Sequence, residues 1–153
     1  MIKSISGIRG TIGGSVGDSF TPIDIVKFTS AYAKFILDQN NTSKKIIVGR
    51  DARISGKFVS DLVCGTLVGC GFDVVDVGLS TTPTIEVSVQ REKASGGIIL
   101  TASHNPKQWN ALKLLNNKGE FISSHDGLKI LELAEKNDYY FSTIDKIGSL
   151  SFD

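Results

Sequence analysis

The chain has 153 residues, of which 41% are hydrophobic and 22% charged, and its formal net charge is +1. This length and composition predict one compact globular domain over 1–153 and exclude a disordered chain. The near-neutral charge excludes nucleic-acid binding by bulk electrostatics, and no apolar run could span a bilayer. No secretory signal is visible, and Cys64 and Cys70 are expected to be buried, reduced thiols. We therefore expect a cytoplasmic protein with neither a nucleic-acid nor a membrane partner.

The first half of the chain predicts two strands and two helices around glycine-rich loops. Residues 1–20 are rich in glycine, serine and threonine, which indicates a structured loop after a short strand. Thr21-Pro22 suits a helix N-terminus, and apolar residues at helical spacing predict a helix over 21–38. A β-branched strand over 45–48 leads into a charged loop, and a second helix is predicted over 58–70, with Gly71 as its C-cap.

The second half continues the alternation of strands and helices. A strand is predicted over 72–77, a short helix from Thr82 to about Val87, and a strand over 97–100. The next strand, 111–115, ends at a turn formed by residues 116–119. A last helix fits 126–136, where Ser123 and Asp126 resemble a capping box. The tail over 139–153 is expected to begin a connection to another part of a longer protein.

The order of these elements predicts an α/β fold. Helices should cover both faces of a mixed, mostly parallel sheet of about four core strands, which makes a three-layer α/β/α domain. The loop between 97–100 and 111–115 is too short for a crossover helix. The last core strand should therefore run antiparallel to its neighbour.

Two polar loops are expected to form a ligand site. In open α/β sheets, ligands bind beyond the carboxyl ends of the parallel strands, where the loops 49–56 and 101–110 should lie. Ser103 could act as a nucleophile there. His104 is adjacent to it, however, and adjacent side chains on extended backbone point to opposite faces, which argues against a hydrolase triad. Phosphoryl transfer instead needs cations around the phosphate. Candidate cations in or beside the glycine-rich loops are Arg9, Arg50, Arg53, Lys113 and Lys118.

Residues 101–106, Thr-Ala-Ser-His-Asn-Pro, resemble the active-site serine motif of the α-D-phosphohexomutases, which include phosphoglucomutase, phosphomannomutase and phosphoglucosamine mutase. Residues 6–10, Ser-Gly-Ile-Arg-Gly, are similar to the family's N-terminal substrate-facing loop. Residues 49–56 are similar to its second loop, and Asn110 and Lys113 follow the serine at the family's spacing. The resemblance covers nearly the whole chain in the right order, and it corresponds to the first of the family's four domains.

The resemblance implies a role for each matching residue. Ser103 would carry a phosphoryl group, exchange it with a hexose or aminohexose phosphate through a sugar bisphosphate, and ligate Mg²⁺ through a phosphoryl oxygen. Lys113 and Arg9 match the positions for proton transfer and charge stabilisation, and His104 matches a residue that contacts the reacting groups. The implied substrate-binding residues are Ser6, Arg9, Arg50, Asn105 and Lys113. Hexose 1,6-bisphosphate is the implied activator.

Several alternatives stay open from the sequence. The motifs for the metal loop, the sugar-reading loop and the phosphate clamp of the other domains are missing, so the chain alone is expected to be inactive. It could also be a stand-alone phosphosugar-binding or regulatory module, or a serine hydrolase. At single positions, Arg50 and Asp51 could form a structural ion pair, Ser55 could cap the following helix, and Lys118 could be a surface turn residue. Which sugar phosphate is used is not disclosed.

Overall fold

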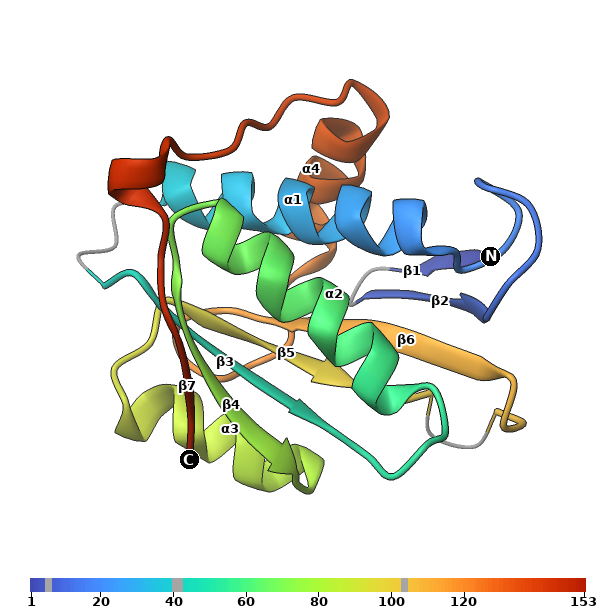
Figure 1. Ribbon diagram of the computed structural model, residues 1–153, viewed down its shortest axis with the longest axis horizontal. Coiled ribbons are helices and arrows are strands. Elements are labelled where there is room, and N and C mark those ends of the chain that lie inside the picture. The colour runs from blue at the N-terminus through green and yellow to red at the C-terminus, as the bar shows by residue number, and fades with distance from the viewer. Residues whose placement is uncertain (5–6, 40–42, 103–104) are drawn as a thin grey trace.

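The computed structural model describes residues 1–4, 7–39, 43–102 and 105–153, in which helices pack on the two faces of one sheet (Figure 1). The elements in chain order are β1 (Ile2–Ser4), β2 (Gly7–Thr11), α1 (Pro22–Asp38), β3 (Lys45–Arg50), α2 (Gly56–Gly69), β4 (Asp73–Leu79), α3 (Thr82–Arg91), β5 (Gly96–Leu100), β6 (Trp109–Leu115), α4 (Ser124–Glu135), the 3-10 helix η1 (Ile144–Lys146) and β7 (Leu150–Phe152). Among the described residues, no helix has the length and apolar character needed to cross a membrane.

The sheet has the order β1-β2-β6-β5-β3-β4-β7. Strands β5, β3, β4 and β7 are parallel neighbours, whereas β6 runs antiparallel to both β5 and β2. The predicted α/β class and the antiparallel last core strand are therefore confirmed. The expected strand count of about four is wrong, because the described residues contribute seven strands to the sheet.

The additional strands lie at the two edges of the sheet, where the sequence pattern is weakest. Strand β2 contains Gly7 and Gly10, and glycine has low strand propensity, so its pairing with β6 is not visible from residue types. Strand β7 has three exposed residues that pair in parallel with β4. The end of the tail that was expected to be a connection is therefore an edge strand. It is held by main-chain pairing, which leaves no hydrophobic pattern in the sequence.

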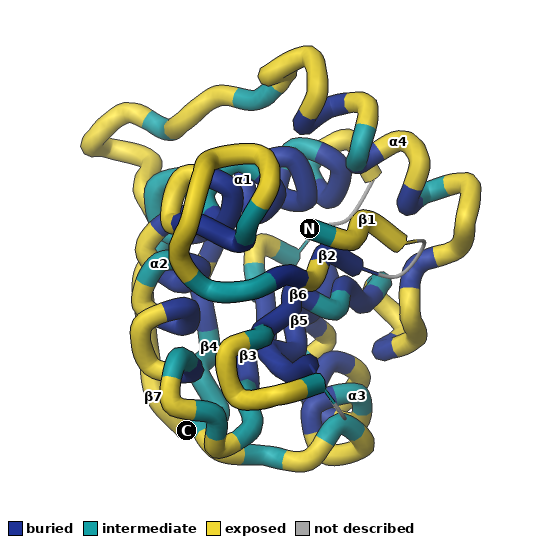
Figure 2. The backbone as a smooth tube through the Cα atoms, turned by 90° about the vertical axis from the view of Figure 1, so that its right-hand side faces the viewer, coloured by how far each residue is buried: buried dark blue, intermediate teal, exposed yellow. Residues whose placement is uncertain are grey.

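Each face of the sheet has its own apolar core. Helices α1, α2 and α4 lie on one face, and α3 lies on the opposite face (Figure 1). Figure 2 shows the buried segments gathered in the strands and in the sheet-facing sides of the helices. On the α3 side, Ile85 and Val89 pack against Ile47, Ile99 and Leu115. The predicted three-layer arrangement is therefore present.

The start of α1 and the end of α2 follow the predicted capping chemistry. Thr21 is the N-cap of α1, and it forms a capping box with Asp24 while Pro22 occupies the first turn. Gly71, with φ of 95°, follows α2, and the amides of Gly71 and Phe72 bond back to carbonyls of its last turn. Helix α3 continues to Arg91, past the predicted end near Val87.

Tyr32 of α1 joins the first layer to the sheet. Its buried hydroxyl donates to the carbonyl of Leu115 at 2.6 Å and accepts from the amide of Gly97 at 3.0 Å. Burial raises the pKa of the Tyr32 phenol. A side chain at Gly96 would collide with this hydroxyl, so Gly96 admits the contact. Tyr32 therefore links the start of β5 to the end of β6, its neighbour in the sheet.

We expect the free energy of unfolding to fall at alkaline pH because of the two thiols. Burial raises the pKa of Cys64 and of Cys70 from 9.0 to about 11, so both thiols stay neutral in the folded chain while the unfolded thiols ionise. Their contribution is complete below about pH 9. It is lost as pH rises toward 11, by up to about 1.4 kcal/mol per thiol and pH unit. Denaturant titrations at pH 8 to 11 measure the slope. The Cys64→Ala, Cys70→Ala double variant should show a shallower one, and an equal slope would contradict the prediction.

Candidate active site

The two motif loops meet at one edge of the sheet. Strands β3 and β5 pair in parallel up to Arg50 and Leu100, so the segments that follow them leave the sheet side by side. The amide of Asp51, just after β3, donates to the carbonyl of Leu100, the last residue of β5, at 3.1 Å, which links the starts of the two loops. Strand β6 begins at the same edge, at Trp109. The predicted loop cluster is therefore formed.

Arg53 joins these two loops. Its Nη2 donates to the carbonyl of Asn105 at 2.8 Å, and its Nη1 donates to the carbonyls of Pro106 at 2.8 Å and Trp109 at 3.2 Å. Its side chain is only 11% exposed. The guanidinium therefore binds the main chain at the end of the serine motif and just beyond it.

Asp51 accepts bonds from both loops. Its carboxylate accepts from the hydroxyl of Thr101 at 2.6 Å and from the amide of Arg53 at 3.2 Å, and it forms an ion pair with the Arg53 guanidinium at 3.3 Å. The structural ion pair considered between Arg50 and Asp51 is thus made by Arg53 instead. Among the described residues, the side chain of Arg50 bonds to the main-chain carbonyl of Asp51, at 3.4 Å.

Ser55 and Asn110 form a further link between the loops. The amide nitrogen of Asn110 donates to the hydroxyl of Ser55 at 2.9 Å, and the Asn110 side-chain oxygen accepts from the amide of Ala111 at 2.8 Å. Asn110 is completely buried. Ser55 occupies the N-cap position of α2 but makes no side-chain capping bond. Its expected alternative role as a helix cap is therefore wrong, and the hydroxyl serves the loop contact.

Arg9 and Lys113 share a pocket on the face of the sheet that carries α3. Leu112 and Leu114 point into the core under α1, so Lys113 between them lies on the other face. The pocket has a volume of about 230 Å³ and is lined by Ser4, Gly7, Ile8, Arg9, Ala111, Leu112 and Lys113. Arg9 is exposed, and its Nη1 lies 3.4 Å from the side-chain oxygen of Asn105. Two cationic side chains therefore border one hollow beside the motif loop.

Gly7 makes this arrangement possible, because it pairs directly with Lys113. A Cβ at Gly7 would collide with the carbonyl oxygen of Leu112, so no larger residue fits without moving β2 off β6. We expect Gly7→Ala to lower the free energy of unfolding by about 1–3 kcal/mol, as overpacking does, and to displace Arg9 from Lys113. Chemical denaturation measures the loss.

A matched control for this variant is Gly65→Ala in α2, where an added Cβ meets no atom within 4 Å. That change should leave stability equal or raise it, since alanine is the better helix former by about 1 kcal/mol. Equal stability of the Gly7→Ala and wild-type chains would contradict the close approach of β2 and β6.

The structure brings together only part of the predicted site. Arg9, Asn105 and Lys113 lie around one pocket and its adjoining loop. Arg50 lies apart from them, because its guanidinium is next to Gly56 at the start of α2, on the other side of the sheet. Ser6, Ser103 and His104 lie outside the described residues. The residues flanking 103–104 are held together by a bond from the Asn105 amide to the Ala102 carbonyl at 3.0 Å.

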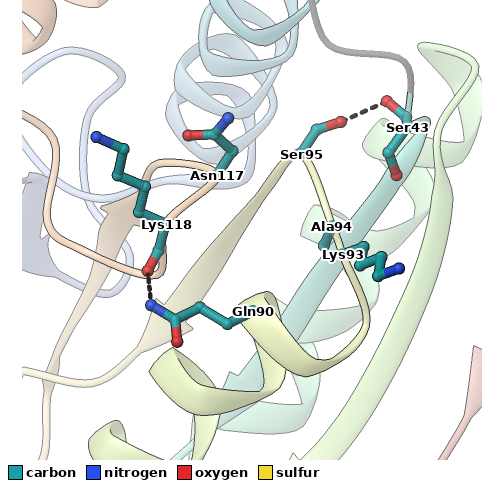
Figure 3. A pocket seen from close by; sticks show the side chains of 7 residues that line it. All are labelled: Ser43, Gln90, Lys93, Ala94, Ser95, Asn117 and Lys118. Carbon is teal, nitrogen blue, oxygen red and sulfur yellow. Dashed lines mark hydrogen bonds between the residues drawn. The ribbon is translucent and has the colours of Figure 1, made fainter.

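Two other observations delimit the site. A pocket of about 410 Å³ that includes Lys93, Ser95 and Lys118 lies where β5 begins, at the opposite edge of the sheet (Figure 3). Lys118 belongs to the turn after β6, as the surface-turn alternative predicted. No group of three His, Cys, Asp or Glu side chains that could hold a metal ion occurs among the described residues.

Comparison with known proteins places the chain in a family. Residues 2–141 match the model of the phosphoglucomutase/phosphomannomutase alpha/beta/alpha domain I. The phosphoglucomutase/phosphomannomutase of Thermococcus kodakarensis is 32% identical over 92% of this chain and 31% of that protein. The phosphoglucosamine mutase of Clostridioides difficile is 31% identical over 94% of this chain and 30% of that protein.

The fold gives the same result. A solved structure of a protein from Thermus thermophilus superposes with a TM-score of 0.81 and 27% identity, over 98% of this chain and 32% of that one. The chain thus spans about a third of the length of the relatives it matches. It belongs to the phosphoglucomutase/phosphomannomutase family and corresponds to that family's domain I.

Proposed function

We propose that this chain is the phosphoserine-bearing first domain of a longer phosphohexomutase. That enzyme would move a phosphoryl group between the C6 and C1 oxygens of a hexose or aminohexose phosphate. The observation that carries the proposal is the pocket shared by Arg9 and Lys113, beside the loop that contains the serine motif. Cations next to a loop that holds a phosphoryl group suit a reaction in which catalysis is mostly positioning and charge stabilisation.

In the proposed reaction, the phosphorus–oxygen bond to Ser103 breaks as a new one forms to a sugar hydroxyl oxygen. The hydroxyl gives up its proton, and the Ser103 oxygen gains one. The resulting sugar bisphosphate turns over and returns its other phosphate to Ser103, with the proton transfers reversed. Lys113 is proposed to move the proton at the attacking hydroxyl, and Arg9 to stabilise the negative charge that develops beside it.

The remaining substrate contacts are assigned by resemblance. Asn105 is held next to Arg9 and would contact the sugar phosphate, together with His104 and Ser6. Arg50 is left out of this proposed contact, because its guanidinium lies beside Gly56 on the other side of the sheet. Mg²⁺ would supply charge neutralisation at the phosphoryl group. The oxygen of phosphorylated Ser103 would be one ligand and three aspartates of a further domain the others. We accordingly propose that the other domains of the longer protein are obligatory partners.

A second candidate is a phosphosugar-binding module without turnover. It is supported by the same pocket, because a cationic hollow can bind a phosphosugar without turning it over. Because the chain spans only about a third of the length of its relatives, we also propose that the 153-residue chain alone does not isomerise sugar phosphates. Under this alternative, the pocket beside Arg9 and Lys113 would bind a hexose phosphate without phosphorylation of Ser103.

The test compares the chain alone with the full-length protein that contains it. Both are incubated with Mg²⁺, glucose 1-phosphate and catalytic glucose 1,6-bisphosphate, and then assayed for glucose 6-phosphate and, by peptide mass spectrometry, for phosphoserine at Ser103. The mannose and glucosamine phosphates are run in parallel. The proposal expects turnover and phosphoserine in the full-length protein and no turnover in the chain alone. Labelling of Ser103 by a fluorophosphonate probe, with no phosphoserine, would instead indicate a serine hydrolase.

A further inference from the structure

We propose that Arg53 is a positioning residue that holds the loop carrying Ser103 in its working geometry. The inference rests on the proposed function for its catalytic consequence, but its structural part concerns only the described residues. Arg53 lies in the loop after β3, whereas its main-chain acceptors Asn105 and Pro106 are at the end of the serine motif, some fifty positions later in the chain. It is therefore a cross-link between two loops that local sequence does not connect.

The strength of the cross-link comes from the fixed shape of the guanidinium. Its two terminal nitrogens bond three main-chain carbonyls, those of Asn105, Pro106 and Trp109, at 2.8–3.2 Å. A planar fork with donors in fixed directions holds several acceptors at once, which a single ammonium group on a flexible stem does not. The three carbonyls are consequently fixed relative to one another as well as to Arg53.

Asp51, which anchors the guanidinium of Arg53, is itself held in place. Asp51 orients the guanidinium through its carboxylate and is itself fixed by the hydroxyl of Thr101, the first residue of the serine motif. Thr101 is buried and follows the core strand β5. Residues 101 and 105, on both sides of positions 102–104, are thereby tied to the pair Asp51–Arg53.

The geometry separates this role from direct catalysis. The contacts described for Arg53 run to loop carbonyls and to a carboxylate of its own loop, and its side chain is 11% exposed. Arg9 and Lys113, in contrast, border a pocket. These contacts lead us to expect that Arg53 acts on the reaction through the loop, so its loss should affect the rate of phosphoryl transfer more than the affinity for the sugar phosphate.

The structural part is tested by hydrogen–deuterium exchange on the 153-residue chain. In Arg53→Ala, we expect the amides of Asn105 and Trp109, which bond within this loop, to exchange at least about tenfold faster, while peptides from α1 keep their protection. Arg53→Lys keeps the charge and should restore only part of the protection. Lys57→Ala, which removes an exposed charge from the nearby start of α2, should leave the loop unchanged. Unaltered exchange of the loop in both Arg53 variants would overturn the inference.

The catalytic part is tested by kinetics of the full-length protein. Arg53→Ala and Arg53→Lys should lower kcat about ten- to a hundredfold while KM for glucose 1-phosphate changes by less than about threefold. A purely structural role would lower the amount of folded enzyme without separating kcat from KM per folded molecule. A raised KM with unchanged kcat would show that Arg53 binds substrate and would overturn the assignment. If the wild-type protein lacks phosphoserine, the proposed function fails, and the exchange result still decides whether Arg53 holds the loop.

Discussion

Replacing Ser103 by alanine should abolish both phosphoserine and turnover in the full-length protein. The reaction needs an oxygen that accepts and returns the phosphoryl group, and alanine has none. We expect kcat to fall by about a thousandfold or more, as is usual when a covalent nucleophile is removed. Intact-mass spectrometry should show that the variant no longer gains the mass of one phosphoryl group from glucose 1,6-bisphosphate.

The control for this variant is Ser124→Ala, which removes an exposed serine hydroxyl from the first turn of α4. It should keep wild-type phosphorylation and kcat. Both variants should have the same denaturant midpoint as the wild type, since neither hydroxyl is expected to contribute much to the free energy of unfolding. Unchanged mutase activity of Ser103→Ala would show that this serine does not carry the phosphoryl group. It would also contradict the mechanism inferred from the family resemblance.

The core of the fold could be predicted from the sequence because it depends on residue types. The β-branched segment that forms β3 and the spacing of apolar residues in α1 both follow from burial, which selects side chains directly. The edge strands could not be predicted in the same way. Strand β2 is held on β6 by main-chain bonds, and the close approach of the two strands requires that Gly7 has no side chain. Neither feature produces a periodic pattern of residue types in the sequence.

The site shows the same division. The meeting of the two loops follows from parallel strands ending at one edge, so it was predictable from the alternation of strands and helices. The residue that forms the ion pair with Asp51 could not be predicted in this way. Arg50 and Arg53 have the same chemistry, and only the strand geometry decides that Arg50 lies toward α2 while Arg53 reaches back to the serine loop. The spacing of Asp51 and Arg53 in the motif indicated that the two residues could pair. It did not show that the Arg53 side chain points toward the serine loop.

Conservative exchanges at Lys113 and Arg9 should separate their two proposed roles. We expect Lys113→Met to lower kcat by about 10²–10⁴-fold, the usual contribution of a group that transfers a proton. Lys113→Arg should restore little of that rate, because a guanidinium keeps its proton at any physiological pH. Phosphoserine at Ser103, delivered by incubation with glucose 1,6-bisphosphate before the assay, should be quantified in each variant so that single-turnover rates refer to loaded enzyme.

Arg9 should respond in the opposite way. If its positive charge is what the reaction uses, Arg9→Met should lose activity and Arg9→Lys should keep a substantial part of it, because an ammonium group also stabilises developing negative charge. The two residues line one pocket on neighbouring strands, so a general loss of local structure would affect all four variants alike. Activity rescued at position 9 by lysine but not at position 113 by arginine is the pattern that proton transfer by Lys113 requires. Rescue at both positions would reduce Lys113 to a second charge beside the phosphoryl group.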